Sequence, residues 1–349
     1  MMARRRFIRT LVASGGLLWF CPSRLLAAKS PETFEPSYAA AERTGLLARR
    51  IEEAFTIMES CSLCPRRCGV NRLNGEEGFC RSPMKPVIYS AQPHFGEEVP
   101  LVGRHGSGTI FFSNCNLRCV FCQNWPIAHE GRGRPVDEDE MASMMLALQR
   151  KGCHNINLVT PTHVMPHILK AARIAFRKGL RIPLVYNTSG YELPEVIRLL
   201  DGIVDIYLPD MKYAHDEQAD KYSSGAFDYP LMARQSIVEM NRQVGALEVD
   251  HDGIAQRGVI LRHLVMPNGV AGSRDVLLWV SENLPGSTYV NVMSQYRVEY
   301  KAYDYAEIAR GVTVEEYLEA VSWAEEFGLT RLDNRAGALR QFYLRLRGG

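Results

Sequence analysis

The sequence predicts an α/β protein: a partial (β/α)6 barrel of the TIM type, preceded by a cysteine-rich extension. After residue 108, short apolar runs alternate with longer segments of helical period. This alternation is typical of parallel strands joined by helical crossovers. Prolines stand at or near the first turn of several helical segments, where they favour a helix start. Six units are fewer than the eight of a closed barrel, so we expect a partial one.

The expected strands are the short apolar runs Thr109–Phe112, Asn155–Thr160, Ile182–Asn187, Ile203–Leu208, Val259–Val265 and Tyr289–Val292. The expected helices are Glu138–Lys151, Pro166–Lys178, Pro194–Leu200, Pro230–Gly245, Asp275–Asn283 and Thr313–Phe327. One more helix is expected upstream, over Ala39–Glu59, where apolar residues recur at helical spacing. In barrels of this kind the chemistry lies on loops that follow the strands.

We divide the chain into five segments. They are a signal segment (1–28), a linker and helix (29–60), a cysteine-rich metal-binding extension (61–100), the barrel core (101–300) and a C-terminal helical extension (301–349). The 349 residues carry a formal net charge of +2, which gives no reason to expect nucleic acid as a partner. The nine cysteines are an odd number and fall into clusters, which favours metal binding over a disulfide framework.

The N-terminal segment has the features of an export signal. Arg4-Arg5-Arg6-Phe7-Ile8-Arg9 is a basic region, and a weakly apolar stretch and small residues follow it. The Arg-Arg-x-Phe order resembles a twin-arginine signal, the bacterial address for exporting folded proteins. The apolar run is too short to span a membrane. We therefore expect an exported, periplasmic protein; the alternative is a cytoplasmic protein with an uncleaved basic N-terminus.

Four cysteines precede the barrel in the order Cys61-x2-Cys64-x3-Cys68-x11-Cys80. Four thiolates can complete a tetrahedral shell with no vacancy, as in structural zinc and iron–sulfur sites. Because the segment is too short for a core of its own, metal binding would supply much of its folding free energy. Disulfide pairing after export is the alternative.

Three further cysteines form the loop after the first strand, with Cys115, Cys119 and Cys122 at C-x3-C-x2-C spacing. A [4Fe–4S] cube takes four ligands, and three from one loop leave one iron free. An open coordination position distinguishes a catalytic metal site from a closed structural one. The alternative is a loop without a catalytic cluster, either a zinc site or three unrelated buried thiols.

This C-x3-C-x-aromatic-C motif, with Phe121 in the aromatic position, resembles the signature of radical S-adenosylmethionine (SAM) enzymes. The surrounding residues are similar to one branch, proteins related to pyruvate formate-lyase activating enzyme. The resemblance implies a [4Fe–4S] cluster whose free iron binds SAM, and reductive cleavage of SAM to a 5′-deoxyadenosyl radical. It further implies packing of Phe121 on the adenine side and an electron donor of the flavodoxin or ferredoxin type. The similarity to the activase branch implies a glycyl-radical protein as substrate.

The ends of later strands carry further candidate residues. Asp210 and Lys212 follow the fourth strand and resemble the Asp-x-Lys of glycyl-radical activases, which contacts SAM. A carboxylate can accept ribose hydroxyls, and an ammonium can bind the methionine carboxylate. Arg262 lies within the apolar fifth strand, where burial requires a carboxylate partner, from SAM or an acidic neighbour. An ordinary surface ion pair is the alternative for Asp210 and Lys212.

The second and third strands end in hydroxyl-bearing segments. Many relatives have Gly-Gly-Glu after the second strand to bind the SAM amino group, but this chain has Thr160-Pro161-Thr162-His163. We take Thr160 as a SAM contact and leave His163 open between site residue and surface histidine. Ser189 follows the third strand and either reaches a ligand or makes a turn. Gln295 is a further candidate for the adenine or ribose side.

Residues 81–108 are rich in proline and glycine, and we expect irregular structure there. His94, Glu97, Glu98 and His105 are then expected to be solvated loop residues, with a position facing the substrate as the alternative, and Cys153 a buried thiol. Two other classes of protein remain as alternatives to an enzyme. One is a non-catalytic iron–sulfur electron-transfer protein, and the other is an exported zinc-binding scaffold.

Overall fold

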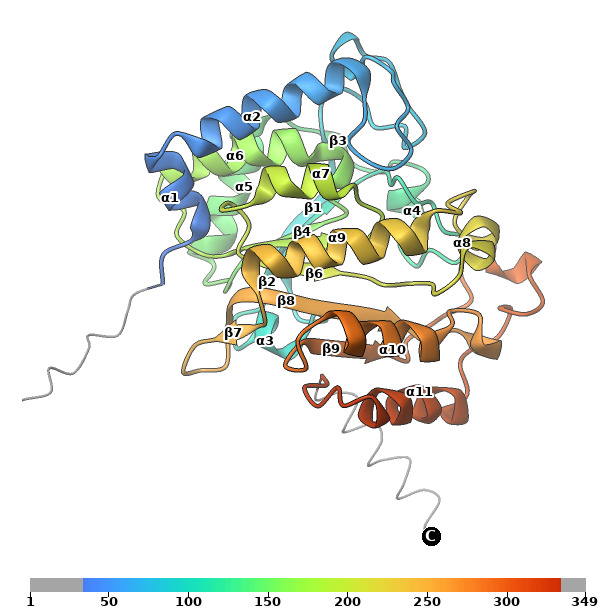
Figure 1. Ribbon diagram of the computed structural model, residues 1–349. Helices are drawn as coiled ribbons and strands as arrows, with labels where there is room; N and C mark the ends of the chain where they lie inside the picture. The colour runs from blue at the N-terminus through green and yellow to red at the C-terminus, as the bar shows by residue number, and fades with distance from the viewer. Residues whose placement is uncertain (1–33, 334–349) are drawn as a thin grey trace, which may run out of the picture. The chain divides into compact units, whose positions relative to one another are not determined.

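A computed structural model describes residues 34–333, and within them one sheet organises the chain (Figure 1). Its six parallel strands are neighbours in the order β2 (Ser107–Phe112), β4 (Ile156–Val159), β5 (Leu184–Thr188), β6 (Ile206–Pro209), β8 (Ala255–Leu264) and β9 (Tyr289–Met293). All six predicted strands are present, with ends shifted by a few residues. The partial barrel with a cysteine-rich segment before it is confirmed.

The helices of the described part are α1 (Ser37–Arg43), α2 (Leu46–Ile57), α3 (Val99–Val102), α4 (Trp125–Ala128), α5 (Glu138–Arg150), α6 (Met165–Arg177), α7 (Pro194–Ile197), α8 (Asp216–Tyr222), α9 (Tyr229–Val244), α10 (Ser273–Asn283) and α11 (Val314–Glu326). Local chemistry fixes several starts. Asp137 and Glu140 form a capping box on α5, and Pro166 and Pro230 stand in the first turns of α6 and α9.

Neighbouring helices pack in pairs along the outer side of the sheet, α5 with α6, α6 with α2, and α10 with α11 (Figure 1). Two apolar cores lie beneath them. One joins α2, α5 and α6 to the first strands, and the other joins α9, α10 and α11 to the cysteine loop after β2. No helix among residues 34–333 has the length and apolar character needed to cross a bilayer.

Two predictions about the N-terminal half are wrong. The single helix expected over Ala39–Glu59 is two helices, because Gly45 takes a left-handed conformation (φ +75°) between α1 and α2. Residues 81–108 are not wholly irregular. They contain the strand β1 (Val87–His94), which pairs antiparallel with β2, and the short helix α3. Two two-residue strands, β3 (Arg134–Pro135) and β7 (Glu248–Val249), pair with β1 and β8.

The segment that follows β1 closes the floor of the barrel. Leu101 of α3 packs in a small buried cluster with Val185, Ile206 and Ile260, separate from the two cores beneath the helices. Asn155 donates a hydrogen bond to the Leu101 carbonyl (2.9 Å). The barrel interior is therefore filled at the amino ends of the strands and can hold a ligand only towards their carboxyl ends.

The predicted signal at 1–28 lies outside the described residues. So do part of the 29–60 linker and residues 334–349 of the C-terminal extension.

Candidate functional site

The inward faces of the strands change from apolar to polar along their length. Side chains alternate along a strand, so Ile260 and Arg262 share the inward face of β8, as Val185 and Asn187 share that of β5. Ile260 and Val185 belong to the floor, whereas Arg262 and Asn187 lie one step nearer the carboxyl ends. Polar side chains therefore line the barrel interior on the carboxyl-end side of the apolar floor.

A pocket of about 350 Å³ opens at this end of the strands. Its lining includes the residues to which the sequence analysis assigned a cluster or SAM role: Cys115, Cys119, Cys122, Phe121, Thr160, Ser189, Asp210, Lys212 and Arg262. The ends of four strands and the loop after β2 supply these side chains. Residues separated by up to about half of the chain therefore share one cavity, which is the arrangement a ligand spanning the strand ends requires.

The loop Cys115–Cys122 (the cluster loop) is held in a bent conformation. Asn114 and Arg118 have left-handed backbone angles (φ +74° and +54°). The Leu117 amide donates to Cys115 Sγ (3.4 Å) and the Ser223 hydroxyl to Cys119 Sγ (3.1 Å). Hydrogen bonds of this kind stabilise negative charge on sulfur and tune iron–sulfur centres. The loop is thus built to support thiolates.

Burial opposes ionisation of these thiols. Burial raises the pKa of Cys119 to about 11, against the opposing charge of Lys212, and that of Cys122 to about 12. Thiolates at these positions therefore depend on a bound cation, as metal ligation provides. Among residues 34–333, no three histidine, cysteine or acidic side chains converge on the position of a single ion. A cube does not require such convergence, because each thiolate binds a different iron.

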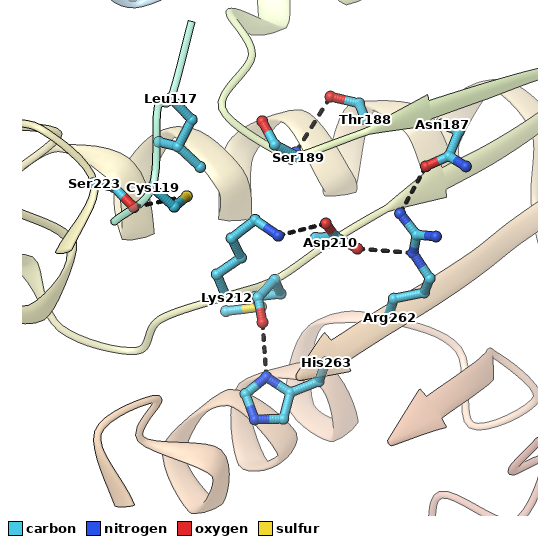
Figure 2. Close-up of polar contacts among 12 residues, drawn as sticks. Leu117, Cys119, Asn187, Thr188, Ser189, Asp210, Lys212, Ser223, Arg262 and His263 are labelled. Carbon is cyan, nitrogen blue, oxygen red and sulfur yellow. Dashed lines mark hydrogen bonds and ion pairs between the residues drawn. The ribbon is translucent and has the colours of Figure 1, made fainter. Parts of the chain in front are cut away.

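Asp210, Lys212 and Arg262 form a buried ionic network in the same pocket (Figure 2). Lys212 Nζ lies 2.6 Å from Asp210 Oδ2, and Arg262 Nε lies 2.7 Å from Asp210 Oδ1. Arg262 also donates to Asn187 Oδ1 (2.6 Å). Burial would raise the pKa of Asp210, but Arg262 and then Lys212 outweigh it, so its pKa is lowered. All three groups stay charged at neutral pH.

The turn after β5 and the ring of Phe121 complete the surroundings of the pocket. Gly190 (φ +81°) brings the turn after β5 against the Asp210 carbonyl, which a Cβ would strike. The hydroxyl of Ser189 is buried, and it has no hydrogen-bond partner among the described residues. Phe121 packs against Tyr213 and Tyr296. An unpaired hydroxyl beside a charged network and three thiols fits a polar, charged ligand such as SAM.

Comparison with known proteins agrees with this arrangement. The model of the radical SAM superfamily matches residues 109–233, from β2 into α9. Uncharacterized protein MJ0674 of Methanocaldococcus jannaschii is 34% identical over 323 residues, which cover 89% of this chain and 88% of that protein. The chain belongs to the radical SAM superfamily. Proteins of this superfamily use a [4Fe–4S] cluster and SAM.

Other similarities are more distant. Uncharacterized protein MJ0808 of the same organism is 26% identical over 161 residues, 40% of this chain and 46% of that protein. A radical SAM methyltransferase from Sphaerobacter thermophilus aligns with a TM-score of 0.44 and 17% identity, over 63% of this chain and 64% of that one. Methylornithine synthase aligns with a TM-score of 0.41 and 13% identity, over 62% and 60%.

Two residues of the segment in place of Gly-Gly-Glu do not reach the radical SAM pocket. His163 is buried, and its Nε2 donates to the Ser113 carbonyl (2.8 Å). Burial, with the nearby Arg72 charge, lowers the pKa of His163 to about 3. Thr162 donates to the buried carboxyl of Glu192 (2.5 Å). His163 is therefore neither a surface histidine nor a residue of the SAM pocket; it lines the small cavity of the upstream cysteines, and Thr160 is the member of this segment that lines the SAM pocket.

Two residues that the sequence analysis left as solvated do line the radical SAM pocket. Glu97 is 9% exposed and lies 3.7 Å from Arg262 Nη1, and His94 lies 3.4 Å from Glu97. The missed signal was Val87–His94, whose apolar start indicates a strand. Gln295 also lines the pocket, whereas Glu98 binds Asn291 (2.8 Å) below it.

The four upstream cysteines line a second, much smaller cavity of about 10 Å³. Cys61, Cys64, Cys68 and Cys80 all lie on its wall. All eight cysteines of the described part are free thiols, so the disulfide alternative finds no support. Gly78 lies so close to Cys68 that a Cβ would come within 2.8 Å of its sulfur. The Phe79 amide donates to the same sulfur (3.3 Å).

Arg72 gives this small cavity a positive wall. It is 1% exposed and donates to the His163 carbonyl (2.6 Å), the Ser82 hydroxyl (2.9 Å) and the Pro83 carbonyl (3.1 Å). No carboxylate pairs with it in the described part of the chain. A buried, unpaired guanidinium is costly. Four thiolates around a divalent ion carry net negative charge and would offset that cost.

Arg66 ties the cysteine-rich extension to the cluster loop. It lies between Cys64 and Cys68, and it donates to the carbonyls of Asn116 (3.1 Å) and Ser223 (3.0 Å). Its guanidinium also stacks on Phe79, 3.8 Å from the ring centre. The two cysteine groups are thus mechanically linked.

Proposed function

We propose that Cys115, Cys119 and Cys122 hold the [4Fe–4S] cluster and that SAM lies across the strand ends in the same pocket. The observation that carries this proposal is the convergence of three thiols and the ionic network on one cavity of about 350 Å³. When bound, the cluster and SAM supply a 5′-deoxyadenosyl radical that abstracts hydrogen. The chain's own residues bind, orient and shield these groups.

Each wall has a role that its chemistry supports. Lys212 binds the methionine carboxylate, and Asp210 accepts hydrogen bonds from the ribose hydroxyls. Arg262 holds Asp210 in place. The unpaired Ser189 hydroxyl and Thr160 supply further polar contacts, and Phe121 packs on the adenine side. The apolar floor beneath them keeps water from entering from below.

For the substrate we propose a protein, activated by hydrogen abstraction as in glycyl-radical systems. The support is resemblance: the Asp-x-Lys at the end of β6 and the arginine of β8 match the activase pattern. The pocket is open to solvent beside Gln123 and Gln295, which leaves a path for a loop of a second protein.

The test is anaerobic incubation of the cluster-loaded protein with SAM and dithionite, followed by assay for 5′-deoxyadenosine. We expect product from the wild type, none from Cys119→Ala, and wild-type levels from Cys153→Ala. Cys153 is a matched control because it is buried and free but lies outside both cysteine groups. Absence of product from wild type with a full cluster would refute the enzyme proposal.

We propose a second metal, zinc or iron–sulfur, at Cys61, Cys64, Cys68 and Cys80. The buried Arg72 without a carboxylate partner supports an anionic tetrathiolate centre there. Metal analysis of anaerobically purified Cys119→Ala protein, which keeps only this group intact, distinguishes zinc from iron with sulfide. Protein with neither would contradict the site.

For localisation we propose export by the twin-arginine-type segment. The support is the basic Arg4–Arg9 run followed by a short apolar stretch. Arg4→Lys with Arg5→Lys should retain the protein in the cytoplasm, as cell fractionation would measure. Unchanged fractionation would favour the cytoplasmic alternative.

A further inference from the structure

A second surface pocket touches the cluster loop away from the ionic network. It has a volume of about 300 Å³ and is lined by Arg118, Val120, His129, Lys221, Ser224, Tyr300, Lys301 and Tyr305. The lining holds three cations and no carboxylate. Since charged residues on protein surfaces normally occur with both signs interspersed, this lining is strongly biased towards binding an anion.

Two of these cations are without an acidic partner in residues 34–333. Lys221 pairs with Glu307, but neither Arg118 nor Lys301 meets a carboxylate. Arg118 Nη1 is also buried without a hydrogen-bond partner in that part of the chain. Arg81 adds a third unpaired charge nearby. Burial of His129, together with Arg118, Lys301 and Arg81, lowers the pKa of His129 to about 4.

This basic pocket lies within one residue of a cluster thiol. Arg118 precedes Cys119 directly and is itself part of the cluster loop. The Lys301 amide donates to the carbonyl of Val120 (2.9 Å), and His129 Nε2 donates to the carbonyl of Cys119 (3.0 Å). Any molecule seated here approaches the cluster from a side that does not require entry into the SAM pocket.

Aromatic side chains surround the cations. Trp125 stacks on Tyr300, with ring centres 5.6 Å apart, and Tyr303, two residues beyond Lys301, is 69% exposed. Arginine, tyrosine and tryptophan are enriched in protein interfaces. The basic character extends from the pocket to exposed Arg81 and Lys301, so the feature suits a protein surface better than a small free anion.

We propose that this basic pocket is the docking site of the electron donor, an acidic one-electron carrier protein of the flavodoxin or ferredoxin class. Carboxylates of the donor pair with Arg118, Lys301 and Arg81. One electron passes from the donor's reduced flavin or iron–sulfur centre to the enzyme's cluster, which oxidises the donor and reduces the cluster by one electron each. Electron-transfer complexes are small and transient, and charge complementarity sets their association rate. This proposal rests on the proposed function, because it supplies the reductant for SAM cleavage.

The test uses the full-length, cluster-loaded protein and oxidised flavodoxin as the probe. Lys301→Glu with Arg81→Glu reverses two exposed charges of the pocket. Arg104→Glu with Lys151→Glu reverses two exposed charges just before β2 and β4, at the opposite ends of the strands. At low ionic strength we expect the first pair to raise the Kd for flavodoxin about tenfold or more and the control pair to leave it unchanged.

A second readout separates this proposal from the proposed function. Dithionite-driven 5′-deoxyadenosine formation should be equal in both pairs and wild type, while flavodoxin-driven formation should fall only in the first pair. Equal flavodoxin affinity in all three proteins would overturn the docking site, even if SAM cleavage is intact. Tight binding of inorganic phosphate, with flavodoxin affinity indifferent to the charge reversals, would instead identify a small-anion site and also overturn it.

Discussion

The two cysteine groups of this chain place the same side chain in opposite surroundings. Cys115, Cys119 and Cys122 line a cavity of about 350 Å³, whereas the four upstream thiols line one of about 10 Å³. The first group offers three thiols in an open pocket that also holds a charged network, and the second offers four thiols around a space that packing almost closes. The difference indicates that the number of thiols and the space around them, more than the thiols themselves, separate a reactive centre from a structural one.

The counter-charges differ in the same way. Lys212, which lowers the thiol pKa values in the open pocket, is already paired with Asp210 and can exchange that partner for a ligand. Arg72 in the closed cavity meets no carboxylate in the described residues and is fixed by two carbonyls and a hydroxyl. A replaceable ion pair suits binding and release, while a fixed cation suits a permanent anion.

The largest effects are expected when one thiol of each cysteine group is replaced. Cys119→Ala should abolish SAM cleavage with little change in the melting temperature, because its cluster caps an already folded barrel. Cys64→Ala should instead release the metal of the small cavity and lower the melting temperature, since metal binding there supplies folding free energy. Product assay, metal analysis and calorimetry on both variants measure SAM cleavage, metal content and melting temperature. Loss of cleavage without loss of metal or stability in Cys64→Ala would contradict separate roles.

The next effect concerns Arg72, and its sign depends on the metal. In the metal-bound protein, Arg72→Met leaves an anionic centre without its cation, at a cost of about 3–5 kcal/mol in the free energy of unfolding. In metal-stripped protein the same change removes an unpaired buried cation and should be neutral or stabilising. Denaturant unfolding with and without a chelator makes the comparison. Equal destabilisation in both states would show that Arg72 does not balance a metal centre.

A smaller effect is expected in the open pocket. Asp210→Asn removes the group that holds Lys212 and Arg262, and SAM affinity should fall about 10–100-fold. Because the folded pKa of Asp210 is lowered, its contribution is present above its unfolded pKa and is lost only as the pH falls through the folded value. SAM binding measured by equilibrium dialysis should therefore show no titration of this group between about pH 6 and 8. A midpoint in that range that Asp210→Asn abolishes would contradict the assignment.

The smallest effect belongs to Glu192, which lies between the two regions. It accepts hydrogen bonds from Thr162 and Thr188, and burial raises its pKa to about 7. A raised pKa means that its stabilising contribution is complete below the unfolded value and is lost as the pH rises towards 7. Glu192→Gln should remove a slope of at most about 1.4 kcal/mol per pH unit from the stability profile. An unchanged profile in urea unfolding would show that the carboxyl ionises freely.

Much of this protein could be predicted from local patterns. Apolar period along the chain located all six parallel strands, because burial of one or both strand faces restricts the residues found there. Spacing located both cysteine groups, since thiols that share a metal must be near one another. Charged residues at strand ends pointed to the pocket, because carboxyl ends of parallel strands meet at one edge. Gly45 by itself indicates the break between α1 and α2, because glycine readily takes a left-handed conformation.

What the sequence determined by itself is which apolar runs form buried strands, which strands run in parallel and which cysteines are grouped along the chain, because these depend on neighbours in the sequence. Only the tertiary structure decided which cavity each side chain enters. It placed His163 and Arg72 at the small cavity and Thr160 at the large one, and it brought Glu97 to Arg262 across the barrel. Such contacts join segments up to about half the chain apart. Which segments meet depends on how the strands and helices pack, and the periodicity of apolar residues along the chain carries no information about it.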